Sequence, residues 1–186
     1  KGRKRSISPR RKRMNGVIEN VLELSRRKPP LPVRLNLKNW VEEFVTQFPQ
    51  TVEDAAEIRV TVEPGGTEVR VDPGQLGQAL TNLVLNGLRY SKQRTSRATL
   101  CLEGGLDATT DRPYLNVIDD GPGVPDDQVA HLFEPFFTTE RTGTGLGLYI
   151  TRELCEANQA RVTYTRHHGG GSCFRITFAH PDRITA

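Results

Sequence analysis

Two asparagines spaced one helical turn apart are the first residues whose type suggests chemistry. Asn82 and Asn86 lie in the segment DPGQLGQALTNLVLNGLRYS, which predicts a helix over 73–91 that starts at Asp72 and Pro73. Asparagine is unfavourable inside a helix because its amide competes for backbone groups, so a pair at this spacing requires an explanation. An amide oxygen can bind a hard cation such as Mg²⁺, which prefers oxygen ligands. A solvated polar helix face is the alternative.

A carboxylate at the end of an apolar strand is the second candidate. The segment LNVIDDGPGV ends in Asp119 and Asp120, followed by Gly121 and Gly123, and a plain turn would also fit this pattern. An acid at the end of a buried strand is nevertheless costly unless it has a partner. A carboxylate accepts a hydrogen bond from an exocyclic amine, which adenine has and guanine lacks at the corresponding position. Such a charged hydrogen bond contributes about 1.5–3 kcal/mol, which is enough to choose between purines.

Three glycines precede a second helix-forming run. Gly143, Gly145 and Gly147 lie in TERTGTGLGLYITREL. Helix N-termini present free N–H groups and a partial positive charge, and glycines in front of them allow a phosphate to approach closely. The preceding FEPFFTTERTG is expected to form a mobile lid. Arg141, near its end, could reach a terminal phosphate, and a surface arginine is the alternative.

Together these segments resemble the ATP-binding catalytic domain of sensor histidine kinases, in the wider GHKL superfamily that includes Hsp90, DNA gyrase and MutL. QALTNLVLNGLRYS is similar to the N box of that family, DDGPGV to the first glycine box, FEPFFTT to the F box and GTGLGLYI to the second glycine box. The order and spacing agree over residues 35–179. The resemblance is closest to the type IV pilus and nitrogen-regulation class of sensor kinases.

The resemblance implies roles for individual residues. Asn86 would hold Mg²⁺, Asp119 would bind the adenine amine, and the catalytic set would be Asn82, Asn86, Arg89 and Arg141. The residues expected to contact ATP are Asn82, Asn86, Arg89, Tyr90, Asp119, Gly121, Gly123, Thr142, Gly143, Thr144, Gly145, Leu146, Gly147 and Leu148.

The resemblance also assigns structural roles around the nucleotide. Phe133, Phe136 and Phe137 would anchor the lid, and Leu146 and Leu148 would seat the following helix.

The implied function is to bind Mg-ATP and to transfer its γ-phosphoryl group to a histidine of a dimerisation helix in two-component signalling. An ATP-binding regulatory module without transferase activity of its own is the alternative. The ATP-hydrolysing relatives carry a glutamate where this chain has Asn82, and an amide cannot act as a general base near neutral pH. The site is therefore better suited to phosphoryl transfer than to hydrolysis.

The phosphoacceptor is expected on another segment, because none of His131, His167, His168 and His180 lies in a phosphoacceptor motif. The implied partners are the phosphoacceptor helix hairpin of a dimeric full-length chain and a response regulator. That full-length protein is expected to be anchored in the inner membrane, with this part in the cytoplasm.

The elements that must position these residues predict the fold class α/β, a two-layer α/β sandwich (Bergerat ATP-binding fold) with a mixed sheet and helices on one face. The expected catalytic domain covers 33–182. The runs EIRVTVE and TEVRVD, separated by three turn-forming residues from Pro64 to Gly66, predict a hairpin. Further strands are expected at RLNL, RATLCLEG, RPYLNVIDD, ARVTYTR and SCFRITFA, and further helices at NWVEEFVTQF and up to about Ala157.

The basic character of the chain is confined to its N-terminus. Residues 1–13 carry eight Lys or Arg and no acid, which leaves 18 basic and 22 acidic residues elsewhere. We interpret 1–11 as a disordered or non-native tail and expect no nucleic-acid binding, because no aromatic residue is interleaved to stack on bases. Residues 12–32 resemble the second dimerisation helix followed by a proline-rich linker. Cys101, Cys155 and Cys173 show no metal-site spacing and are expected to be small core residues in a reducing compartment.

Overall fold

The computed structural model describes residues 29–48, 56–140 and 143–182 of the chain. The basic tail 1–11 and the expected dimerisation helix, up to residue 28, lie outside them. In chain order the elements are β1 (Val33–Asn36), α2 (Leu37–Gln47), β2 (Glu57–Glu63), β3 (Glu68–Val71), α3 (Pro73–Thr95), β4 (Thr99–Leu106), β5 (Pro113–Asp119), α4 (Asp126–Val129), α5 (Gly147–Ala157), β6 (Arg161–Arg166) and β7 (Ser172–Thr177).

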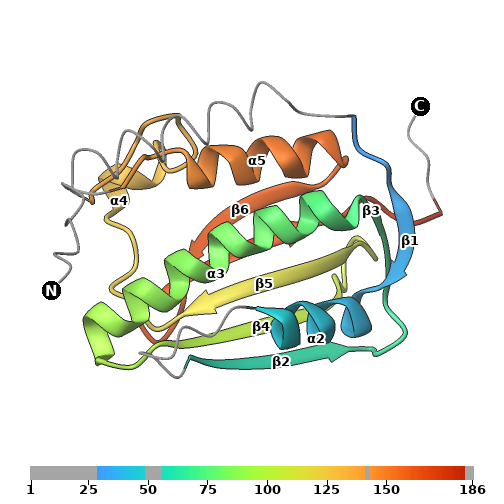
Figure 1. The fold of residues 1–186 in the computed structure, drawn as a ribbon, viewed down its shortest axis with the longest axis horizontal. Coiled ribbons are helices and arrows are strands. Elements are labelled where there is room, and N and C mark those ends of the chain that lie inside the picture. Colours follow the sequence, from blue (N-terminus) through green and yellow to red (C-terminus); the bar gives the residue numbers. More distant parts are fainter. Residues whose placement is uncertain (1–28, 49–55, 141–142, 183–186) are drawn as a thin grey trace, which may run out of the picture.

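A five-stranded mixed sheet in the order β2-β4-β5-β7-β6 forms one layer, and α2, α3 and α5 cover one of its faces (Figure 1). The pairing of β2 with β4 is parallel, whereas the other three pairings are antiparallel. The predicted α/β two-layer sandwich with helices on one face is therefore confirmed. Among the described residues, no helix combines the length and the apolar character needed to cross a membrane.

The hairpin predicted for β2 and β3 is wrong. β2 pairs with β4 in the main sheet, whereas β3 pairs antiparallel with β1 in a separate two-stranded sheet. Alternation of apolar and polar residues indicates only which face of a strand is buried. It does not identify the neighbouring strand, which here is set by contacts with segments distant in the sequence.

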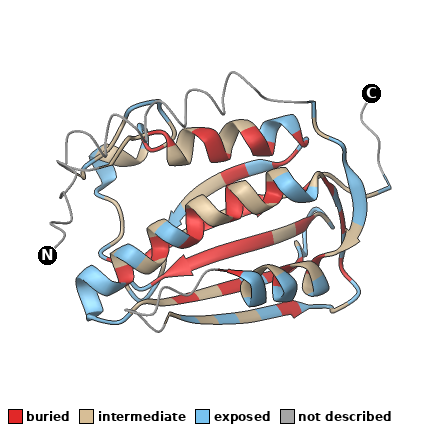
Figure 2. Cartoon of the chain, in the orientation of Figure 1, coloured by how far each residue is buried: buried red, intermediate tan, exposed pale blue. Residues whose placement is uncertain are grey.

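Helix α3 begins where the sequence predicts and runs four residues further. The Oδ1 atom of Asp72 accepts hydrogen bonds from the backbone nitrogens of Gly74 and Gln75, at 2.9 and 3.0 Å, which satisfies two free donors of the first turn. Pro73 occupies the first turn, and the helix ends at Thr95, before the C-cap residue Ser96, which has a left-handed backbone conformation. An apolar stripe on α3 packs into the core between the helices and the sheet, formed by Leu76, Ala79, Leu80, Leu83 and Val84 (Figure 2).

The central strand β5 is buried along almost its whole length, because it lies between β4 and β7 and under α3. The strand ends at Asp119, which is only 3% exposed. This strand therefore places the Asp119 carboxylate under α3, at the C-terminal end of the central strand.

The three cysteines are free thiols. Cys155 lies in the core, and burial raises the pKa of its thiol to about 12. Cys101 and Cys173 are half-buried and alternate with core residues of β4 and β7, so they lie on the sheet face away from the helices. The prediction of a core position is therefore confirmed for Cys155 and wrong for the other two.

Candidate functional site

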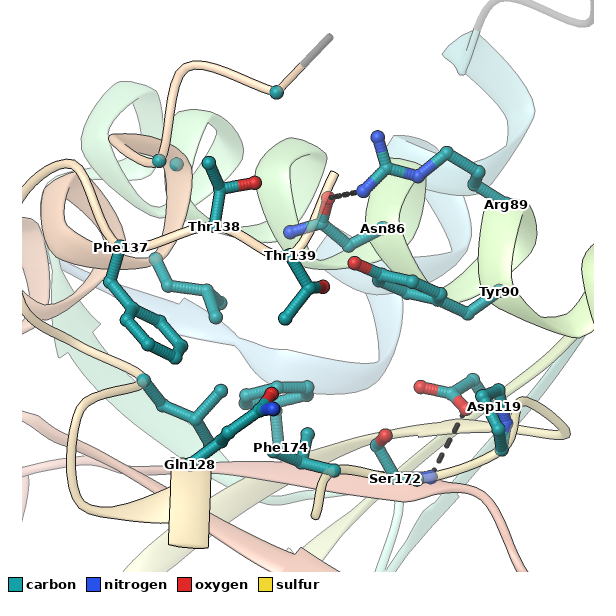
Figure 3. A pocket seen from close by; sticks show the side chains of 18 of the residues that line it. Asn86, Arg89, Tyr90, Asp119, Gln128, Phe137, Thr138, Thr139, Ser172 and Phe174 are labelled. Carbon is teal, nitrogen blue, oxygen red and sulfur yellow. Dashed lines mark hydrogen bonds between the residues drawn. The ribbon is translucent and has the colours of Figure 1, made fainter. Parts of the chain in front are cut away.

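A cavity of about 610 Å³ lies between α3, the segment from 122 to 147, and the ends of β5 and β7. This volume suits a ligand of nucleotide size. Figure 3 shows Asp119 and Ser172 at one end of the cavity and Asn86 and Arg89 at the other. The residues that line the cavity are Asn82, Asn86, Arg89, Tyr90, Asp119, Pro122, Gly123, Val124, Pro125, Gln128, Leu132, Phe137, Thr138, Thr139, Gly143, Thr144, Gly145, Gly147, Leu148, Arg166, Ser172 and Phe174.

Among the described residues, Asp119 is the one acid in the wall of the cavity. Its Oδ1 atom accepts hydrogen bonds from the backbone nitrogens of Gly121, at 2.8 Å, and Ser172, at 3.1 Å. Burial raises the pKa of the Asp119 carboxyl above its usual range, and the two backbone donors oppose this shift only in part. The second carboxylate oxygen points toward the cavity (Figure 3). This end of the cavity is therefore suited to accept a hydrogen bond from a ligand.

Gly171 lies against the backbone of Asp119. A β-carbon at residue 171 would overlap the carbonyl oxygen of Asp119, so only glycine fits this close approach of the β6–β7 turn to the end of β5. The sequence analysis singled out no residue of this turn, so it missed this requirement.

The polar stripe of α3 forms one side of the cavity. The Oδ1 atom of Asn86 accepts a hydrogen bond of 3.3 Å from Arg89 Nη2, and the guanidinium of Arg89 lies 4.8 Å from the ring centroid of Tyr90. Asn82 Nδ2 donates to the carbonyl oxygen of Gly147 at 3.2 Å. The structure thus brings both asparagines to the cavity, and it joins one of them to the start of α5.

The second glycine box forms the opposite end of the site. Gly145 has φ +69°, and a β-carbon there would clash with the backbone of Phe136, so the chain can cross the lid at this point only as glycine. Leu146 is 1% exposed and packs with Ala79 and Ile150 of the neighbouring helices. The N-terminus of α5 at Gly147 therefore faces the cavity and provides a partial positive charge there.

The lid segment carries the three expected phenylalanines, but they do not share one role. Phe133 packs edge-to-face on Phe174 of β7, with ring centroids 6.3 Å apart, and Phe137 lines the cavity. Phe136 has a left-handed backbone conformation (φ +67°) and is 62% exposed. The prediction that Phe136 anchors the lid is therefore wrong in this conformation.

Of the expected nucleotide contacts that lie in the described residues, all but Gly121 and Leu146 line the cavity. These two residues lie next to cavity residues: the backbone nitrogen of Gly121 donates to the Asp119 carboxylate, and Leu146 packs against α5. Leu148 lines the cavity and also contacts the main core. Arg141 and Thr142 lie outside the described residues.

Several cavity residues were not identified from the sequence. They come from strands β6 and β7 and from the segment that runs from α4 to the second glycine box, namely Arg166, Ser172, Phe174, Gln128, Leu132, Thr138 and Thr139. Only the FEPFFTT match pointed to this region, and no local pattern distinguishes Ser172 from any other residue that starts a strand.

The donor set fits Mg²⁺ that is held mainly by a ligand's phosphates. Asn86 offers one amide oxygen at the cavity wall, and among the described residues no group of three or more His, Cys, Asp or Glu could hold a metal ion by itself. Mg²⁺ usually takes one or two protein oxygens and completes its shell with phosphates and water.

Comparisons with known proteins agree with this geometry. Residues 71–182 match the family described as histidine kinase-, DNA gyrase B- and HSP90-like ATPase. Over 179 residues the chain is 52% identical to the sensor protein kinase PilS of Pseudomonas aeruginosa. The matched region covers 96% of this chain and 34% of that protein. The chain therefore spans about a third of the length of this relative.

Two solved structures share the fold. Full-length ShkA in complex with AMPPNP superimposes with a TM-score of 0.73 at 24% identity, covering 91% of this chain and 36% of that one. Histidine kinase ThkA in complex with the response regulator protein TrrA gives a TM-score of 0.72 at 20% identity, covering 92% and 49%.

Proposed function

Because the chain belongs to the family of histidine kinase-, DNA gyrase B- and HSP90-like ATPases, we propose that it binds Mg-ATP and transfers the γ-phosphoryl group to a histidine of a dimerisation helix. The observation that carries this proposal is the polarity of the cavity. A buried carboxylate stands at one end, and a helix N-terminus with an amide oxygen and a guanidinium stands at the other.

The adenine base would lie at the Asp119 end. Asp119 would accept the hydrogen bond of the exocyclic amine, while two backbone N–H groups hold its other oxygen in place. Guanine has no amine at the corresponding position, so the site would prefer ATP over GTP. Tyr90, Leu132 and Phe174 provide ring and apolar surface for the base.

The triphosphate would lie at the other end. The N-terminal N–H groups of α5 and the guanidinium of Arg89 would bind the phosphate oxygens, and Asn86 would hold Mg²⁺. When bound, Mg²⁺ supplies neutralisation of the charge on the phosphates. In the transfer, an unprotonated imidazole nitrogen of the acceptor attacks the γ-phosphorus, and the bond to the β–γ bridging oxygen breaks. ADP leaves with that electron pair, so the chain's task is to position the phosphates and to stabilise charge.

Asn82 supports transfer over hydrolysis. Its amide has no proton-accepting strength near neutral pH, and its nitrogen already donates to Gly147. Nothing at this position activates water, so a nucleophile brought by another segment would be favoured.

We place the phosphoacceptor on a helix hairpin of the dimeric full-length protein, with a response regulator as the subsequent acceptor. The complex of ThkA with a response regulator supports this kind of partner for the shared fold. The 52% identity to a sensor protein kinase supports a role as the cytoplasmic part of an inner-membrane sensor in the pilus-regulation class.

A titration of the chain with a fluorescent ATP analogue, with and without Mg²⁺, tests binding. We expect saturable binding that Mg²⁺ strengthens and that excess ADP reverses. Well-folded protein that shows no binding to millimolar adenine nucleotide would contradict the proposal.

Mixing the chain with a separately supplied acceptor hairpin of the PilS type and γ-labelled ATP tests transfer. Acid-labile label on the hairpin is the expected result. Intact nucleotide binding without labelling would favour the alternative, an ATP-binding regulatory module without transferase activity.

A further inference from the structure

Arg94, in the last turn of α3, contacts two turns of the chain that are far apart in the sequence. Its Nη1 atom donates to the carbonyl oxygens of Asp120, at 3.2 Å, and Gly121, at 3.0 Å. Its Nη2 atom donates to the carbonyl oxygen of Gly169, at 3.2 Å. The first two carbonyls follow β5, and the third belongs to the β6–β7 turn, so one guanidinium joins both turns at the C-terminal end of α3.

The same two turns hold the carboxylate of the cavity. The backbone nitrogen of Gly121 belongs to the first turn, and that of Ser172 follows the second, and both donate to Asp119 Oδ1. The distance between the two donors sets the direction of the carboxylate, because Oδ1 must satisfy both. Arg94 therefore binds carbonyl oxygens of both turns, whereas Asp119 binds backbone N–H groups at both turns.

Two further contacts show how closely α3 holds this region. Ser91 Oγ, one turn before the arginine, accepts a hydrogen bond of 2.8 Å from the backbone nitrogen of Asp120. A β-carbon on Gly170 would lie 2.9 Å from Arg94 Nη1, so the guanidinium packs directly against the turn. All three acceptors of Arg94 are neutral carbonyls, which indicates a bridging role and not an ion pair.

We propose that Arg94 is a positioning residue for adenine selection: it holds the two turns at the separation that aims the Asp119 carboxylate into the cavity. The inference rests on the proposed nucleotide function and adds to it a specificity determinant that lies outside the cavity wall. Arginine suits this role because its planar fork presents several donors in fixed directions, whereas lysine presents a single flexible ammonium.

The test compares ADP with GDP by calorimetry, using the full chain. Arg94→Met is expected to raise the Kd for ADP about tenfold, the equivalent of one well-formed hydrogen bond to the base. The Kd for GDP should change little, because guanine makes no such bond with Asp119. The preference for ADP over GDP should therefore fall by about the same factor. A general loss of folding would instead weaken the binding of ADP and of GDP by similar factors.

Two further variants separate bridging from charge and from folding. Arg94→Lys keeps the charge but cannot span both turns, so its preference for ADP over GDP should fall as in Arg94→Met. An undiminished preference for ADP in Arg94→Lys would overturn the bridging role. Arg97→Met is the matched control, because Arg97 is exposed nearby and its guanidinium contacts Glu57 at 3.4 Å. It should bind both nucleotides as the unmodified chain does.

A double-mutant cycle provides the decisive readout. If Arg94 acts through Asp119, Arg94→Met should have no further effect on ADP binding in an Asp119→Asn background. Equal effects in both backgrounds, or an unchanged preference in Arg94→Met, would overturn the inference while leaving the proposed function intact. Failure of the unmodified chain to bind ADP would instead contradict the proposed function, and the inference with it.

Discussion

The side-chain nitrogen of Asn82 lies 3.2 Å from the carbonyl oxygen of Gly147 and donates a hydrogen bond to it across 65 positions of the chain. This bond joins the middle of α3 to the first residue of α5. The two helices provide the amide and N–H groups at the phosphate end of the cavity, so their relative position matters for binding as well as for stability.

Asn82→Ala is expected to lower the free energy of unfolding by about 1 kcal/mol, the usual contribution of a neutral hydrogen bond. The effect on stability stays small because Gly147 O also accepts from Thr151 Oγ1 at 2.9 Å. ADP binding should weaken about fivefold, since α5 loses the side-chain hydrogen bond that joins Gly147 to α3. Urea unfolding and nucleotide titration measure the two effects. Thr81→Ala, which removes only a bond within α3 to Gly77, is the control; unchanged ADP affinity in Asn82→Ala would argue against a role for this tie.

Asp119→Asn is expected to weaken ADP binding about 10- to 100-fold, because a charged hydrogen bond to the adenine amine is replaced by a weaker one. The asparagine oxygen can still accept from the backbone nitrogens of Gly121 and Ser172, so the fold should persist. Calorimetry with ADP and GDP is the measurement. Asp120→Asn is the matched control, since Asp120 is exposed and accepts from Thr99 Oγ1 at 2.6 Å. If the two variants bind ADP equally well, the adenine assignment is wrong.

The pH dependence of ADP binding should follow the ionisation of Asp119. Burial raises its pKa in the folded protein, and the ionised carboxylate is the form that accepts from adenine. Binding should therefore weaken as the pH falls through this raised pKa, above the range of an ordinary aspartate. Titrations between about pH 4 and 7 should show this limb in the unmodified chain and lose it in Asp119→Asn. A limb that persists in the variant would assign the titration to another group.

The same raised pKa makes a separate prediction about the stability of the protein without nucleotide. Between the unfolded and folded pKa values, the folded state binds the proton more tightly than the unfolded state. The stabilisation from Asp119 is thus present below the unfolded pKa and is lost as the pH rises through the folded pKa. At pH 7, Asp119→Asn should be at least as stable as the unmodified chain in urea unfolding. A variant that is clearly less stable at pH 7 but not at pH 4 would contradict this sign.

Gly171→Ala should destabilise the fold by about 1–3 kcal/mol or more, because the new β-carbon would overlap the carbonyl oxygen of Asp119 and push β7 away from β5. Gly169→Ala, two residues earlier in the same turn, meets its nearest atom at 3.8 Å and should be nearly neutral. Urea unfolding of the two variants is the comparison. Similar midpoints would show that the turn relaxes without cost.

The sequence alone determined those features that depend on neighbours a few residues apart. The start of α3 at Asp72 follows from local capping, and its polar and apolar stripes follow from helical periodicity, as does the strand that ends at Asp119. These short-range patterns identified the asparagines, the acid and the glycines that line the cavity.

Only the tertiary structure decided which distant segments meet. It pairs β2 with β4 instead of β3, brings Ser172 to Asp119 across 53 positions, and sets Arg94 against Gly169 across 75. Strand alternation and helical periodicity indicate which side of an element is buried, but many partners could cover that side. The choice among them is made by the packing of the whole core, and for that reason the residues that aim the carboxylate could not be read from local sequence.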